Sequence, residues 1–139
     1  MRGGCSLRDN RLTEWVVKAD QPGGVLERGR AVSDLNQLKD FVISVFKELF
    51  EIESASSGAL AVFLHGSRAE GTNRPTSDVD VAVVVFDSRL LEGAELAALL
   101  IREAVEESFL PYELDLVVVE AKPENEFVKR VLKGGLRWL

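Results

Sequence analysis

The chain has 139 residues, of which 46% are hydrophobic and 29% charged, and its 17 basic and 23 acidic residues give a formal charge of −6. This length suits one domain with a core of its own, and no apolar run approaches the roughly 20 residues of a membrane span. The acidic balance argues against broad nonspecific binding to nucleic acid, and a single cysteine with no signal-peptide-like apolar start leads us to expect a cytoplasmic protein.

The first 32 residues show weak patterning. Gly3-Gly4 and Pro22-Gly23-Gly24 flank one short apolar stretch, Trp15 to Val17, among scattered charges. Such a composition is typical of segments that bury little surface. We therefore expect residues 1–32 to be a loosely ordered extension and residues 33–139 to form the domain.

An amphipathic helix is predicted from Leu35. Apolar residues recur there at steps of three and four, which places them on one helix face. Asp34 together with Gln37 is expected to cap the start of this helix. The apolar positions are Leu38, Phe41, Val42, Val45, Phe46, Leu49 and Phe50.

The rest of the chain alternates between strand-like and helical segments. Strands are predicted at about 59–65, 79–86 and 113–120. A second helix is expected over about 90–107, and a last helix from Pro123 to about Lys133, stopped by Gly134-Gly135. These elements predict an α/β fold with a small mixed or antiparallel sheet packed against helices.

The most informative motif joins two of the predicted strands. Gly66-Ser67 is followed, after ten residues, by Asp78-Val79-Asp80 at the start of the second strand. Side chains alternate along a strand, so Asp78 and Asp80 would project from one side about 6.5–7 Å apart. Two carboxylates on one edge are suitable ligands for Mg²⁺, whose shell is commonly completed by waters and substrate phosphates. A solvated strand edge is the simpler alternative.

The Gly-Ser turn has a chemistry of its own. Ser67 and Glu70 have the spacing of a capping box, so Gly66 would precede a short helical turn with outward N–H groups. Such a terminus attracts phosphate, and a glycine lets the backbone approach a ligand closely. An ordinary helix cap is the alternative.

The segment from Gly66 to Asp80 resembles the signature of the DNA polymerase beta-like nucleotidyltransferase superfamily, in particular its minimal nucleotidyltransferase branch. The resemblance extends over roughly 35–139. It implies a nucleotidyltransferase fold in which Gly66 and Ser67 hold a nucleoside triphosphate and Asp78 and Asp80 bind divalent metal.

A third metal-binding carboxylate is implied on a later strand, and Asp115 matches it. Glu113 shares its predicted face and is the rival for this role. Arg68 is a candidate contact of the triphosphate, although it could equally balance nearby acidic charge. His65, directly before the Gly-Ser pair, is expected to be a strand-end residue rather than a base.

The resemblance also implies an activity. It is the transfer of a nucleoside monophosphate, AMP from ATP, to an acceptor hydroxyl with two Mg²⁺ ions. The resemblance to minimal nucleotidyltransferases, which are similar to this chain in length, further implies an antitoxin that modifies a small helical HEPN-type partner. A catalytically inactive partner-binding module and a small-molecule nucleotidyltransferase remain as alternatives, and homo-oligomerisation is left open.

Overall fold

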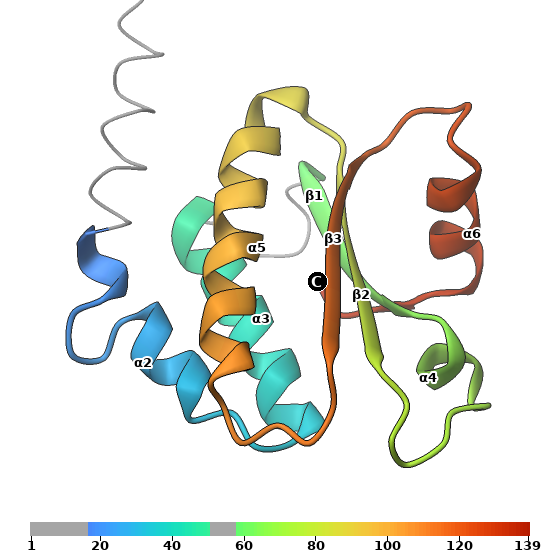
Figure 1. Ribbon diagram of the computed structural model, residues 1–139. Coiled ribbons are helices and arrows are strands. Elements are labelled where there is room, and N and C mark those ends of the chain that lie inside the picture. The colour runs from blue at the N-terminus through green and yellow to red at the C-terminus, as the bar shows by residue number, and fades with distance from the viewer. Residues whose placement is uncertain (1–16, 51–57) are drawn as a thin grey trace, which may run out of the picture.

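A computed structural model describes residues 17–50 and 58–139 of the chain (Figure 1). The helices are α2 (Val25–Arg30), α3 (Leu35–Phe50), α4 (Ser67–Glu70), α5 (Leu91–Glu106) and α6 (Glu126–Gly134). The strands are β1 (Leu60–His65), β2 (Val79–Val85), β3 (Leu114–Glu120) and β4 (Leu136–Arg137).

The four strands form one mixed sheet in the order β3-β2-β1-β4. β1 runs antiparallel to both of its neighbours, whereas β2 and β3 run parallel. A parallel pair needs a long crossover connection, and α5 provides it. The expected α/β architecture is confirmed, and the strands predicted at 59–65, 79–86 and 113–120 each lie within one residue of the observed bounds.

Helices cover the two faces of the sheet unequally (Figure 1). α2, α3 and α5 pack on one face around the larger core, and α6 packs on the other. Along β2, Val79 and Val81 belong to the larger core. Ala82 and Val84 belong to the smaller cluster beneath α6. Because side chains alternate along a strand, Asp80 lies on the α6 face.

α3 forms as its apolar spacing predicts. Six of the seven residues expected on its inner face are buried, and Phe50, at its end, is half-buried. Asp34 caps the helix: its Oδ1 accepts a hydrogen bond of 2.8 Å from the backbone N–H of Gln37. Of the helices that the structure describes, none is long and apolar enough to cross a membrane.

The C-terminal segment differs from the prediction in two ways. α6 begins at Glu126 rather than at Pro123, because the side chain of Asn125 caps it by accepting from the N–H of Val128 at 3.1 Å. After Gly134 the chain forms β4, a two-residue strand that pairs with β1. So short a strand has no periodicity that a sequence could display.

The expected loosely ordered extension lies partly outside the described residues, which begin at 17. From there on the expectation is wrong: Val25, Gly29 and Val32 are buried, and α2 packs against α3 and α5. A Cβ built on Gly29 would meet Ala104 and Phe41. Gly29 thus acts as a contact between helices, and residues 17–32 belong to the folded unit.

Candidate active site

Three polar side chains form one row across the sheet. Asp80 on β2 pairs in register with His65 on β1 and with Asp115 on β3. Register partners place their side chains on the same face of a sheet, so all three lie on the α6 face. The row stands at the end of the sheet where β1 finishes and β2 and β3 begin.

The charges around Asp80 show which carboxylates lie close to it. Its pKa is raised above the ordinary value, first by burial; His65 opposes this shift, and the negative charges of Asp115 and Asp78 add to it. Asp78 and Asp115 are exposed, whereas Asp80 is half-buried. Asp78 lies just before β2 rather than within the strand, but it still acts on Asp80. Asp80 and Asp115 are thus register partners, and Asp78 lies near enough for its charge to act on Asp80.

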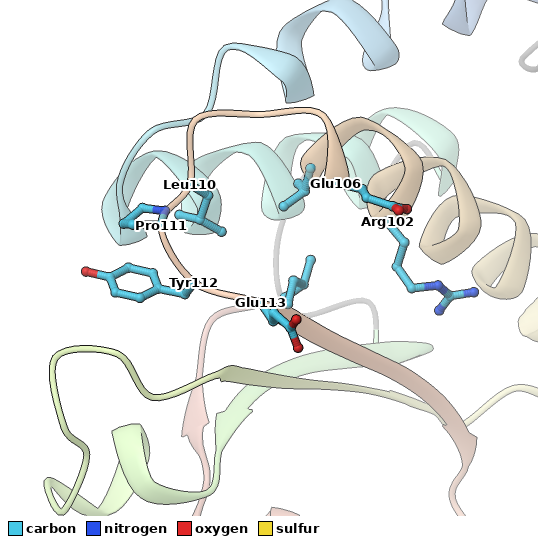
Figure 2. A pocket seen from close by; sticks show the side chains of 8 residues that line it. Arg102, Glu106, Leu110, Pro111, Tyr112 and Glu113 are labelled. Carbon is cyan, nitrogen blue, oxygen red and sulfur yellow. The ribbon is translucent and has the colours of Figure 1, made fainter.

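Glu113, the rival of Asp115, is placed differently. It precedes β3, and its backbone carbonyl accepts from the N–H of Val79 at 2.9 Å. Its side chain lines a cavity of about 530 Å³ between α5 and the start of β3, with Tyr112 at one end and Arg102 at the other (Figure 2). It is Asp115 that lies in register with Asp80, so the geometry favours Asp115.

The Gly66-Ser67 turn lies directly against this row. Gly66 has φ 73° and ψ −156°, a conformation that is essentially restricted to glycine. A Cβ built at this position would collide with Oδ2 of Asp80. The glycine is therefore needed twice, for its backbone angles and for the close approach of the turn to the carboxylate.

The capping box expected at Ser67 is wrong. Gly66, not Ser67, is the N-cap of α4, and no side chain makes a cap hydrogen bond there. The carbonyl of Gly66 instead accepts from the N–H groups of Ala69 and Glu70 at 3.1 and 3.2 Å. The positive φ of Gly66 turns the chain one residue earlier than the sequence pattern suggested, so Ser67 is the first helical residue.

Arg68 is engaged by the loop that leads to Asp78. Its Nε and Nη2 donate to the carbonyl of Ser77 at 3.1 and 2.8 Å, and Nη2 also donates to the carbonyl of Pro75 at 3.3 Å. Its guanidinium carbon lies 4.2 Å from the centroid of the Tyr112 ring. None of these contacts was foreseen, because backbone carbonyls carry no sequence signal and nothing in the sequence pairs Arg68 with Tyr112.

A second cavity, of about 310 Å³, adjoins the turn on the α6 side, and Gly66 and Glu70 contribute to its lining. The rings of His65 and Phe127 pack edge to face, with their centroids 5.3 Å apart. Phe127 and Arg130 were not among the residues predicted for the site. Their spacing of three on one helix placed them on a common face, but nothing in the sequence set that face beside Gly66.

The donor set suits a hard divalent cation. Carboxylate oxygens from Asp78, Asp80 and Asp115 are the ligands Mg²⁺ prefers, and such sites keep waters and substrate oxygens in the remaining positions. In residues 17–50 and 58–139, no three His, Cys, Asp or Glu side chains already surround a single metal position. The fit therefore rests on the kind of donors and on the register that pairs Asp80 with Asp115.

Comparison with known protein families adds independent support. A family model described as a nucleotidyltransferase domain matches residues 42–138, well over half of the chain. The chain belongs to the nucleotidyltransferase domain family. The match includes the Gly-Ser turn and all three carboxylates. No curated protein sequence matches at a significant level. Family membership supports nucleotidyl transfer as the general reaction and a nucleoside triphosphate as the substrate.

Proposed function

We propose that this nucleotidyltransferase transfers AMP from ATP to an acceptor hydroxyl in a Mg²⁺-dependent reaction. The observation that carries the proposal is the register pair Asp80–Asp115 with the Gly66 turn packed directly on Asp80. This arrangement brings a phosphate-compatible turn and metal-compatible carboxylates within one small region of the sheet.

Each residue has a distinct role in the proposed reaction. Gly66 and Ser67 bind the β and γ phosphates, through backbone N–H groups and the Ser67 hydroxyl. Asp78 and Asp80 would hold two Mg²⁺ ions, and Asp115 would share the one on the acceptor side. When bound, the metal supplies charge neutralisation on the phosphates and activation of the acceptor hydroxyl.

The bond changes balance as follows. The acceptor oxygen forms a bond to the α phosphorus while the bond from that phosphorus to its β-bridging oxygen breaks. The hydroxyl proton passes to Asp115, and pyrophosphate leaves with the bonding electron pair. The chain's own contribution is to position the reacting groups and to hold compensating charge.

The exposure of Asp78 and Asp115 leaves the acceptor side open to a large substrate. We propose a protein acceptor, a small helical partner of HEPN type modified on a tyrosine hydroxyl, with the chain acting as an antitoxin. The resemblance to minimal nucleotidyltransferases motivates this choice. The formal charge of −6 favours a basic protein over nucleic acid, since opposite charges speed association.

Calorimetry tests the nucleotide site. ATP should bind in Mg²⁺ and lose affinity in EDTA, because triphosphate and carboxylates repel one another without a cation. Asp80→Asn should weaken this metal-dependent binding. Asp40→Asn, an exposed change on α3, is the matched control and should bind as wild type does. Equal affinity in EDTA and Mg²⁺ would overturn the assignment.

Intact-mass analysis tests the acceptor. The chain should be purified with its partners from its native host and incubated with ATP and Mg²⁺. A gain of one AMP on a partner protein is expected in wild type and should be absent in Asp78→Asn. A modified RNA or small molecule would replace the protein acceptor, and binding without any product would favour an inactive partner-binding module.

A further inference from the structure

Arg68 links three parts of the candidate site. It belongs to α4, directly after Ser67; it donates to the carbonyl of Ser77, directly before Asp78; and it stacks on Tyr112, in the segment that leads to Asp115. We infer that Arg68 is a positioning residue that holds the Asp78 loop and the start of β3 together. Its effect on turnover rests on the proposed function.

The geometry uses properties particular to arginine. Two nitrogens of one planar guanidinium converge on the carbonyl of Ser77, at 3.1 and 2.8 Å. The carbon of the same guanidinium lies over the Tyr112 ring, 4.2 Å from its centroid. A lysine ammonium is a point charge that cannot make this fork and stack at once. Arg68→Lys would therefore keep the positive charge but lose the combined contact with Ser77 and Tyr112.

The loop itself reinforces the arrangement. The N–H of Arg74 donates to Oγ of Ser77 at 2.8 Å, and the N–H of Ser77 donates to the carbonyl of Arg74 at 3.0 Å. These bonds close a turn that ends at Ser77, the residue whose carbonyl also accepts from Arg68. The backbone path into Asp78 is thus fixed from two sides.

This role differs from the phosphate contact that the sequence suggested for Arg68. A phosphate ligand acts through its charge, so lysine would replace it partly and Tyr112 would not matter. A positioning residue acts through shape, so loss of the ring should have the same effect as loss of the guanidinium. The two roles predict different results for the same variants.

Steady-state kinetics with ATP separates them. Arg68→Lys and Tyr112→Leu should each lower kcat by about 10- to 100-fold, the usual effect of losing a residue that orients metal ligands, with little change in KM for ATP. Tyr112→Phe keeps the ring and should behave as wild type. The double variant Arg68→Lys with Tyr112→Leu should be scarcely worse than either single change, because both remove one contact.

An activity-independent measurement keeps this inference separate from the proposed reaction. Amide hydrogen exchange over residues 72–78 should be faster in Arg68→Lys and Tyr112→Leu than in wild type and Tyr112→Phe. Arg30→Gln removes a positive charge from an exposed position of α2 and should leave this exchange unchanged. If wild type lacks turnover but the exchange pattern holds, the reaction is wrong and the positioning role stands. The positioning role would be overturned if Arg68→Lys and Tyr112→Leu both exchanged at the wild-type rate. It would also be overturned if the kcat of Arg68→Lys were close to that of wild type.

Discussion

Asp80 and Asp115 are register partners across the parallel pair of β2 and β3, on the same face of the sheet. Two carboxylates so placed repel one another, and Asp78 adds a third negative charge to the same neighbourhood. A fold gains no stability from such an arrangement on its own. A divalent cation bound between these carboxylates would relieve the repulsion. The repulsion should also lower the stability of the folded protein, so substitutions at the site can be followed by melting temperature.

Asp80→Asn should stabilise the protein at neutral pH. The pKa of Asp80 is raised, mainly by burial, so the folded state holds the proton more tightly than the unfolded state does. The stability that this provides is present below about pH 4 and is lost as pH rises through the raised pKa. Asparagine removes the ionisation, so its advantage in melting temperature should be present at pH 7 and vanish below about pH 4.

Asp40→Asn is the control for this measurement, since Asp40 is exposed on α3. Mg²⁺ should raise the melting temperature of wild type but not of Asp80→Asn, because a ligand stabilises the state that binds it. An Asp80→Asn protein that is less stable than wild type at pH 7 would contradict the electrostatic account.

Asp115→Asn should affect turnover more than ATP binding. Asp115 is assigned to the acceptor side, so its loss should lower kcat by roughly 100-fold or more while the dissociation constant for ATP changes little. Glu113→Gln is the matched control, because Glu113 lines the cavity beside α5 instead of the carboxylate row. Comparable losses in both variants would show that the acceptor-side role is shared.

Gly66→Ala should abolish activity, whereas Gly71→Ala should not. Both glycines have positive φ, 73° and 77°, so both substitutions carry backbone strain of about 1–3 kcal/mol. Only at Gly66 does the new Cβ meet Asp80; at Gly71 it meets nothing within 4 Å. Activity should be measured well below the melting temperature of each variant. Equal activity in the two would mean that the approach of the turn to Asp80 is unimportant.

Gly29→Ala should destabilise the fold, by about 1–3 kcal/mol, because the added methyl group is forced between Ala104 and Phe41. Gly134→Ala, at the end of α6, is the control: its Cβ meets nothing within 4 Å, so urea denaturation should show little change. A neutral Gly29→Ala would support the original expectation that this part of the chain contributes little to the core.

Local sequence signals predicted the elements well. Runs of apolar residues marked β1, β2 and β3, and the three- and four-residue spacing from Leu38 to Leu49 marked α3. The alternation around Asp80 also assigned the faces of β2 correctly. Each of these signals depends on neighbours close in the chain, which a single sequence displays directly.

Contacts between residues far apart in the chain could not be predicted from these local signals. The sequence alone could not place Asp115 beside Asp80, since register depends on how the crossover packs; family resemblance suggested the pair. The partners of Arg68 are mostly backbone carbonyls, and because every residue has one, the sequence does not indicate which carbonyls Arg68 contacts. Residues 17–32 were misread as loosely ordered, because a glycine that allows close helix packing, as Gly29 does, has the same letter as one in a flexible linker.

We expect the crossover through α5 to make the site assemble in steps. β1 and β2 form an antiparallel pair joined by the short segment that includes α4, whereas α5 lies between β2 and β3 in the chain. Contacts between distant segments close later in folding, because they cost more chain entropy. A chain emerging from the ribosome would thus form the Gly66-Ser67 turn and the Asp78–Asp80 segment before Asp115 joins them. We expect the nascent protein to become active only when β3 has joined the sheet. Measurable activity would then indicate that the whole domain has folded.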